Sequence, residues 1–267
     1  MTIRILPIAA ISLAALSLYA CSSDSTGMTG TTGNPSPTIT AHAAMIASDA
    51  VSSDAGLMMP GATGSNLVSY DRGDDDPARG CLFEVLRWRC PTSVSGGLNV
   101  NRSITFFDAS GASQTAFDSL TTASMHIDID ISGTIRRDSW QSDVARHRHF
   151  IVTGMAGVET TRTWNGEGSD TLHRTRFTDS AVTREFDVTV NTTFTDVVIP
   201  VSGDRRHPLS GTATQVVTMQ ETAGDQVGQT FTFTATFTFD GTVRIPFLLG
   251  GRRFHIDLDA DAMTEDD

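Results

Sequence analysis

The amino-acid sequence predicts a mainly β domain in which one N-terminal helix packs against about ten antiparallel strands. Several segments alternate strictly between apolar and polar residues, turn-forming residues separate most of them, and only one segment shows clear helical periodicity. Alternation with a period of two marks strands that have one buried and one solvated face. Strands of that kind are typical of antiparallel sheets, which supports the predicted class.

The width of such a sheet constrains its shape. At about 4.8 Å per strand, an open sheet of about ten strands would be roughly 50 Å wide, whereas a helix covers roughly 10–12 Å. One helix is too narrow to cover the apolar face of that sheet. We therefore expect a curled sheet that forms a half-barrel or a barrel, or alternatively a sandwich.

The N-terminal segment has the features of a secretion signal. Arg4 is the only charged residue before Cys21, and an apolar run follows it over residues 5–18. A positive start, a short apolar core and small residues before a cleavage point are typical of such a signal. A membrane-spanning anchor helix is the alternative, but a span needs about 20 apolar residues. We expect residues 1–20 to be the signal peptide.

The residues at the expected cleavage point, Leu18-Tyr19-Ala20-Cys21, resemble the lipobox of bacterial lipoproteins. The resemblance covers this signal alone, and no family is recognised for the mature domain. It implies a diacylglycerol on the Cys21 thiol, an acylated amino group and, with Ser22 next in the chain, sorting to the outer membrane. Several acyl chains together anchor a protein stably. The resemblance therefore implies a lipid-anchored protein that faces the periplasm or the cell surface.

The remainder of the chain divides into a tether and one domain. Residues 21–37 hold the lipid attachment site and a stretch rich in Ser, Thr, Gly and Pro. As flexible chain, this stretch would span roughly 20–24 Å. Residues 38–267 form the predicted single mainly β domain, which the tether would hold close to the membrane surface.

Two segments are helix candidates. Ser36 and Pro37 suit the N-cap and first turn of a helix, and we expect that helix to end at about Ser53 or Leu57. Residues 112–122 are a weaker candidate, because poor helix formers surround their few apolar residues. The apolar face of the first helix consists of Ile39, Ala43, Ile46, Ala50 and Val51.

Ten segments are predicted strands, separated by turn residues. The clearest alternation covers residues 98–106, 125–135, 185–194, 231–239 and 254–259. Weaker candidates are 146–153, 157–164, 171–178, 212–222 and 243–249. The turn signals lie at residues 108–111, 165–166, 203–204, 223–225 and 240–241.

The loop Phe239-Asp240-Gly241 predicts a hairpin, with Gly241 in the left-handed position of a bulged turn. In that register the strands on either side of the loop pair directly. The expected partners are Thr238 with Thr242, Phe237 with Val243, Ala235 with Ile245, and Phe233 with Phe247.

Cys81 and Cys90 are expected to form a disulfide, because an exported protein meets an oxidising compartment. Bonded cysteines have Cα atoms about 4.4–6.8 Å apart, whereas nine extended steps cover about 30 Å. The chain must therefore reverse between them. Residues 82–89 contain no Gly, Pro, Asn or Asp that would favour such a turn.

Charge and composition exclude some partners and chemistries. The formal net charge is −12, and it becomes −13 once the single arginine of the signal is removed. Acidic residues concentrate in residues 71–76 and 257–267. Such a surface argues against nucleic acid as a partner. All 19 basic residues are arginines, which excludes catalytic lysine chemistry.

Motifs of catalysis and metal binding are mostly absent: the sequence has no Gly-x-Ser-x-Gly, His-Glu-x-x-His or Cys-x-x-Cys. A His-x-Asp-x-Asp pattern occurs twice, starting at His126 and at His255. Its alternate side chains share one strand face, so two neighbouring copies could hold Zn²⁺ or Ca²⁺. Solvated faces of two amphipathic strands are the simpler interpretation. We therefore expect no metal, no cofactor and no catalytic residue.

Residues 146–149, Arg-His-Arg-His, are another charged run. Both histidines lie on one strand face. A solvated strand edge is the simplest interpretation, since edge charges discourage pairing between sheets.

Three classes of function remain after these exclusions. The first is a non-catalytic protein that binds an amphiphile or an envelope component inside the curled sheet. The second is a structural or protein-interaction module with a filled core, and the third is an enzyme that uses His126 or His173 with nearby acids. For the first class, the predicted ligand-lining residues are Phe231, Phe233, Phe237, Ile127, Ile129 and Phe186.

Overall fold

The structure is a computed structural model that describes residues 34–59, 78, 80–157, 159–178, 181–201 and 207–266. The predicted signal peptide, the lipobox with Cys21 and most of the predicted tether lie outside the described residues. The same holds for the acidic segment 71–76 and for the turn predicted at residues 203–204.

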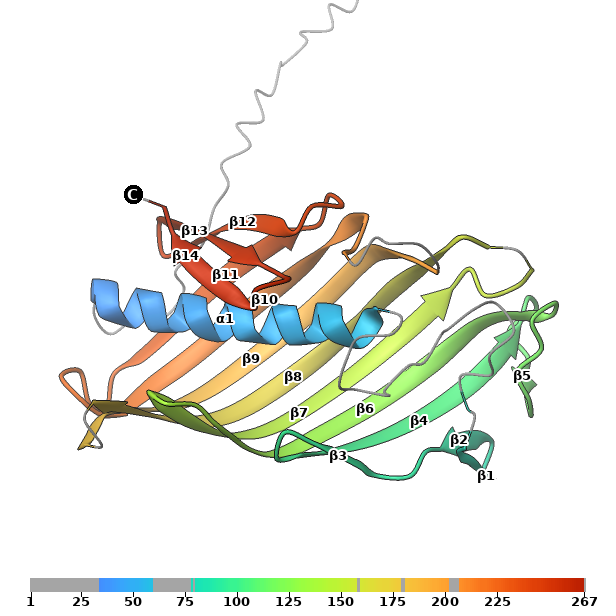
Figure 1. Ribbon diagram of the computed structural model, residues 1–267, viewed down its shortest axis with the longest axis horizontal. Helices are drawn as coiled ribbons and strands as arrows, with labels where there is room; N and C mark the ends of the chain where they lie inside the picture. The colour runs from blue at the N-terminus through green and yellow to red at the C-terminus, as the bar shows by residue number, and fades with distance from the viewer. Residues whose placement is uncertain are drawn as a thin grey trace, which may run out of the picture.

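The described chain forms one helix followed by strands (Figure 1). The helix α1 spans Pro37–Met58. The strands are β1 Leu82–Glu84, β2 Arg87–Arg89, β3 Ser93–Ser95, β4 Leu98–Asp108, β5 Ser113–Gln114, β6 Thr122–Arg136, β7 Trp140–Thr153, β8 Thr161–Thr178, β9 Ala181–Pro200, β10 Ser210–Ala223, β11 Thr230–Thr238, β12 Arg244–Leu249, β13 Arg252–Asp257 and β14 Ala262–Glu265.

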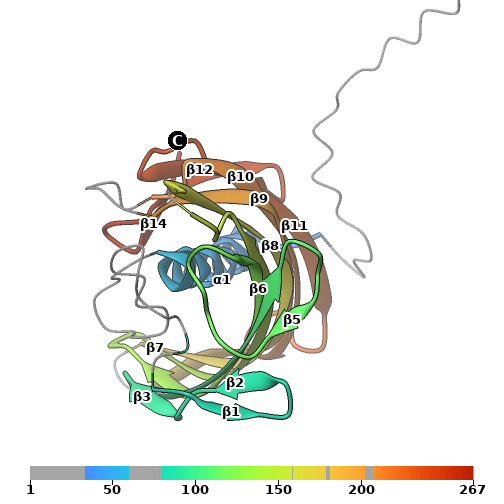
Figure 2. The same ribbon diagram turned by 90° about the vertical axis from the view of Figure 1, so that its right-hand side faces the viewer.

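Two antiparallel sheets contain all of these strands. The large sheet has 11 strands in the order β1-β2-β4-β6-β7-β8-β9-β10-β11, with β3 and β5 also paired to β4. The small sheet has the order β12-β13-β14. Helix α1 contacts β10 and all three strands of the small sheet, and in Figures 1 and 2 it lies against the large sheet. The predicted class, the antiparallel pairing and the single N-terminal helix are confirmed.

The large sheet is open among the described residues. Its path ends at β1 on one side and at β11 on the other, and these two strands do not pair with each other. A closed barrel, one of the predicted shapes, is therefore not formed by the described chain.

Helix α1 forms as predicted from its capping residues. The Ser36 hydroxyl accepts a hydrogen bond from the Ile39 amide at 3.3 Å, and Pro37 occupies the first turn. Both the apolar face and much of the polar face are buried, including Thr40, His42 and Asp54. The helix is therefore an interior element that brings polar groups with it.

The expected disulfide is present and closes a hairpin. Cys81 and Cys90 are bonded, with their Cα atoms 4.0 Å apart, and β1 pairs with β2 between them. The turn consists of Val85 (φ 47°) and Leu86 (φ 67°). Left-handed backbone at non-glycine residues is uncommon, which explains why the sequence showed no turn signal here.

Two local predictions along the chain are wrong. Residues 112–121 form β5 and turns instead of a helix, and Thr122 begins β6. The Asp118 carboxylate accepts from the Leu120 amide at 2.8 Å and fixes a local turn. The pair Asn165-Gly166 lies inside β8 and makes no turn. A Cβ on Gly166 would lie 2.2 Å from the His149 carbonyl oxygen, so this glycine permits close strand approach.

The predicted pairing across the loop at residues 239–241 is also wrong. β11 and β12 belong to different sheets, and β12 pairs with β13. The Gly241 amide donates to the Pro208 carbonyl at 3.0 Å, so the loop is tied to the start of β10 and does not close a hairpin. Phe237 and Phe247 pack through their rings instead, with centroids 4.7 Å apart.

A buried ion-pair network joins α1 to the large sheet. The Arg148 guanidinium bonds both oxygens of Asp54 on the helix, at 2.7 and 3.0 Å. It also bonds both oxygens of Asp170 on β8, at 2.6 and 3.0 Å. Arg146 donates to Asp170 at 3.0 Å and to the Ser53 hydroxyl at 2.7 Å. The side chains of Arg148, Asp54 and Asp170 are fully buried.

This network corrects the interpretation of residues 146–149 as a solvated edge. β7 is a central strand between β6 and β8, and its two arginines face the helix. Burial alone would lower the pKa of Arg148, but the facing carboxylates of Asp54 and Asp170 outweigh it and raise that pKa. Arg148 is therefore a permanent cation, and loss of one carboxylate partner would leave uncompensated buried charge.

Gly168 makes room for this cation. It lies opposite Arg148 in the β7–β8 register, and an added Cβ would lie 2.4 Å from Cδ and 2.6 Å from Nη1 of Arg148. The guanidinium is held by two bidentate ion pairs, so it is not free to move aside.

We predict that Gly168→Ala lowers the free energy of unfolding by about 3 kcal/mol or more, because it displaces Arg148 from two buried carboxylates. Urea unfolding followed by circular dichroism measures the effect. Gly56→Ala is the matched control, because a Cβ on Gly56 meets nothing within 4 Å and alanine favours helix. Equal stability of the two variants would contradict the clamped position of Arg148.

Candidate functional site: a pocket beside the helix

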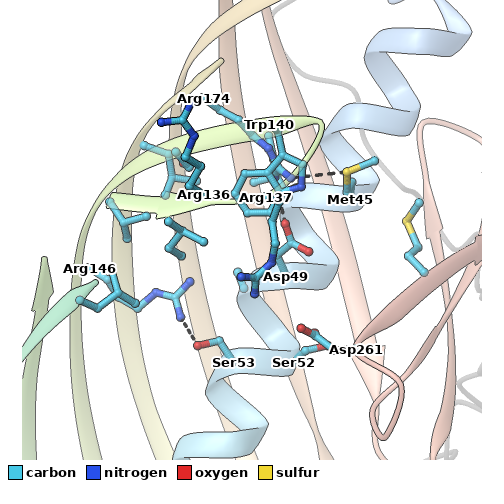
Figure 3. A pocket seen from close by; sticks show the side chains of 18 of the residues that line it. Met45, Asp49, Ser52, Ser53, Arg136, Arg137, Trp140, Arg146, Arg174 and Asp261 are labelled. Carbon is cyan, nitrogen blue, oxygen red and sulfur yellow. Dashed lines mark hydrogen bonds and ion pairs between the residues drawn. The ribbon is translucent and has the colours of Figure 1, made fainter. Parts of the chain in front are cut away.

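An open pocket of ≈ 930 Å³ lies between α1, the ends of β6, β7 and β8, and the β13–β14 segment. Figure 3 shows residues of the helix facing residues of the sheet across this space. The volume lies within the range of about 300–1,000 Å³ that is usual for ligand pockets.

The apolar part of the pocket comes from the inward positions of the strands. Along β6, β7 and β8 these positions alternate with solvated ones, so each strand contributes every second residue. Residues from the β13–β14 segment add apolar surface on the opposite side. The main apolar contributors are Ile131, Ile135, Val144, Leu172, Leu258 and Met263.

One wall is held together by Arg174. Its guanidinium donates to the Asp49 carboxylate at 2.9 Å and to the Met45 sulfur at 3.5 Å, and both partners lie on α1. The same group lies 4.0 Å from the centre of the Trp140 ring. Burial raises the pKa of Asp49, although Arg174 opposes this shift. The helix and the start of β7 are thus fixed to each other at the pocket.

The part of the rim next to this wall carries polar groups without partners (Figure 3). Arg136 ends β6 and Arg137 begins the turn to β7, and both line the pocket. Within the described residues their guanidinium groups have no ion pair. The Ser142 hydroxyl is buried, with the residue only 4 % exposed, and it has no hydrogen-bond partner among those residues. The Ser52 hydroxyl oxygen, on the helix, is also buried and has no hydrogen-bond partner among those residues.

None of the six predicted ligand-lining residues lines this pocket. All six are buried side chains of the central core. Phe186 packs edge-on against the His42 ring, with centroids 5.1 Å apart, and Phe237 packs against Phe247. The alternation correctly identified the inward face, but it carried no information on which part of that face the helix leaves uncovered.

Sequence reasoning missed Trp140, Ser142 and Arg174 as pocket residues. A signal was present for two of them, because Ser142 and Arg174 stand two residues from the inward-facing Val144 and Leu172. A polar residue at an inward position of an alternating strand is therefore a sequence signal for a pocket residue. Asp49 and Met45 had no comparable signal.

The two His-x-Asp-x-Asp patterns are not brought together. His126 lies on β6 of the large sheet and His255 on β13 of the small sheet. On β6, Asp128 accepts from His149 at 2.7 Å, and Asp130 from His147 at 2.8 Å. Across the described part of the chain, no group of three or more His, Cys, Asp or Glu side chains is placed to hold a metal ion.

His173, the other residue considered for catalysis, bonds to Asp187 at 2.8 Å, and both side chains are about half exposed. The hydrogen bond to Asp187 raises the pKa of His173. The pair borders a shallow depression of ≈ 310 Å³ on the large sheet, shared with Thr171, Thr189 and Thr218. The depression is separate from the pocket beside the helix.

Comparison with protein-family models, with curated proteins and with solved structures found no match for this chain. In the described residues, no helix is both long and apolar enough to cross a membrane.

His42 gives the helix interface a pH dependence. The Arg176 guanidinium donates to Nε2 of His42 at 2.9 Å, which requires that nitrogen to be unprotonated. Burial, followed by the charges of Arg176, Arg184 and Arg174, lowers the pKa of His42 from 6.5 to about 4. Protonation of His42 therefore opposes docking of α1.

A lowered folded-state pKa stabilises the fold above the unfolded value of 6.5, and this stabilisation is lost as the pH falls toward 4. We predict that the free energy of unfolding of the parent drops by about 2 kcal/mol more than that of His42→Gln between pH 8 and pH 5. Urea titrations of both proteins at each pH measure this. Parallel pH profiles would contradict a neutral, buried His42.

Proposed function

We propose that this protein is a lipid-anchored envelope protein that binds an amphiphile in the pocket beside α1 without transforming it. The observation that carries the proposal is the composition of the pocket: an apolar surface of Ile131, Ile135, Val144 and Leu172 lies beside a rim of arginines and hydroxyls. Ligand pockets are mostly apolar with a few polar groups that orient the ligand. An amphiphile has the same two parts.

The proposed architecture is a half-barrel, in which the large sheet curves around α1 and leaves one stretch of its inner face uncovered. The open ends at β1 and β11 support this shape over a closed barrel. The ion pairs of Asp54 and Asp49 with the sheet support a fixed position of the helix beside the pocket. The ligand would then occupy space that the helix leaves free and would not displace the helix.

The proposed anchor places the pocket near a source of amphiphiles. Lipid on Cys21 and the tether from residue 21 to residue 37 would keep the domain within a few nanometres of the membrane.

We predict that Cys21→Ser leaves the protein unlipidated, so that it moves from the membrane fraction to the soluble fraction of the cell. Blots of the two fractions measure the distribution. A variant with Cys81→Ser and Cys90→Ser is the control, because it removes two cysteines and keeps the lipobox. Equal membrane retention of the Cys21→Ser variant and the parent would contradict the proposed lipid anchor at Cys21.

The pocket itself is tested by filling it. Ile135 lines the pocket and is partly exposed, so Ile135→Trp places added bulk in open space and not in the packed core. We predict that this variant binds a fluorescent long-chain lipid at least tenfold more weakly than the parent, with an unchanged melting temperature.

Ile151→Trp is the matched control, because Ile151 lies on β7 and is 36 % exposed outside the pocket. It should bind the fluorescent lipid as the parent does. Lipid binding that neither tryptophan weakens would place the ligand elsewhere, and a parent without lipid affinity would reject the proposal.

The second candidate function is an interaction module with a filled core. One observation favours it: the disulfide-closed hairpin exposes apolar side chains, with Leu82 68 %, Val85 90 % and Leu86 66 % exposed. Exposed apolar patches mark contact surfaces. Absence of lipid binding by the parent would leave this candidate as the better one.

A further inference from the structure

We infer that the amphiphile is anionic, and that Arg136, Arg137 and the Ser142 hydroxyl bind its carboxylate or phosphate headgroup. This inference rests on the proposed function, because it assigns the chemistry of the ligand in the same pocket.

The first observation is the distribution of charge. Four of the chain's 19 arginines line the pocket, against three of its 31 acidic residues. A chain with a net charge of −12 repels anions in general. The lining is therefore richer in arginine, relative to acidic residues, than the chain as a whole.

The second observation concerns which of these charges are already neutralised. Arg174 is paired with Asp49, and Arg146 with Asp170. Arg136 and Arg137 have no ion pair within the described residues, and they lie side by side in sequence at the turn that borders the pocket. Guanidinium groups bind carboxylates and phosphates through paired hydrogen bonds, and an unpaired couple of them is suited to such a headgroup.

The third observation is the buried hydroxyl of Ser142. A buried polar group without a partner costs free energy, and a ligand oxygen in the pocket would satisfy it. Ser142 pairs with Ile135 on β6 and with Arg174 on β8. It thus lies where the apolar surface meets the arginine-bearing end of the strands, which is the position expected for the boundary between tail and headgroup.

The pocket also contains three aspartates, which would favour a cationic ligand over an anionic one. Asp49 is committed to Arg174. Asp138 and Asp261 remain, and Figure 3 shows Asp261 near Ser52, on the side of the pocket away from Trp140. Asp138 follows Arg137 directly and Asp261 comes from the segment before β14, so each carboxylate is single. Arg136 and Arg137 are adjacent and provide two cations for one headgroup.

The experiment uses four single-chain probes with the same twelve-carbon tail: dodecanoate, dodecyl phosphate, dodecyl maltoside and dodecyltrimethylammonium. Isothermal titration calorimetry below the micellar concentration measures their affinities for the Cys21→Ser chain, which carries no acyl chains of its own. We expect at least one of the two anions to bind tenfold or more tightly than the trimethylammonium probe. The ratio between the carboxylate and the phosphate then identifies the headgroup.

Arg136→Gln with Arg137→Gln should weaken binding of the preferred anion at least tenfold, which corresponds to about 1.4 kcal/mol. Binding of dodecyl maltoside should stay the same. Arg87→Gln with Arg253→Gln is the matched control, because both arginines are exposed and neither lines the pocket. This control removes the same charge and should leave anion binding unchanged.

The outcomes separate the two proposals. Equal affinity for all four headgroups, or a preference for the cation, overturns the anionic assignment and leaves amphiphile binding in place. An equal loss in the pocket double variant and in the control double variant also overturns the assignment, since it would reflect net charge alone. Absence of binding by every probe overturns the proposed function and the assignment together.

Discussion

The contact on which the arrangement of the domain depends is the Arg148 guanidinium, held between Asp54 of the helix and Asp170 of β8. Three fully buried ionised groups are tolerable only because each is paired and hydrogen-bonded. The bidentate geometry at both carboxylates fixes the helix in position and in rotation about its axis. A purely apolar interface of Ala, Ile and Leu would allow the helix to slide by a turn at small cost, whereas displaced carboxylates would be buried without partners.

The pocket follows from this fixed position. The C-terminal half of α1 is attached through Asp54, its middle through Asp49 and Arg174, and its first half through His42 and Arg176. Because three polar contacts hold the helix along its length, the neighbouring side chains of β6, β7 and β8 are left uncovered on one side. The space beside the helix is thus set by these polar contacts together with the packing of the buried apolar residues of α1.

The sequence allowed the class, the helix and most strands to be predicted, because these depend on local patterns such as the Ser36-Pro37 cap and the alternation in residues 125–135. The failures have a different physical origin. Gly166 resembles a turn residue, but it lies where neighbouring strands approach closely. The turn at Val85 and Leu86 uses residues that disfavour it, and the disulfide closes the hairpin that contains it.

The site was less predictable than the fold. The six core residues chosen from the alternation do face inward, yet which inward positions contact the helix depends on partners far apart in sequence. Asp54 and Arg148 are separated by 94 residues, and nothing local in either segment shows that they meet. The arginines of residues 146–149 were assigned to solvent for the same reason, since their partners could not be identified from the sequence.

The position of α1 at the start of the domain also has a consequence for the order of folding. The helix residues are synthesised before their partners, which follow 94 residues later for Arg148, 125 for Arg174 and 134 for Arg176. The central strands from β6 to β11 each pair with the next strand along the chain, so they can assemble from local hairpins. Contacts between distant segments form slowly, because closing a long loop costs entropy. We therefore expect α1, although it is synthesised before the strands, to dock after β7 and β8 have paired, with Asp54 hydrated until then.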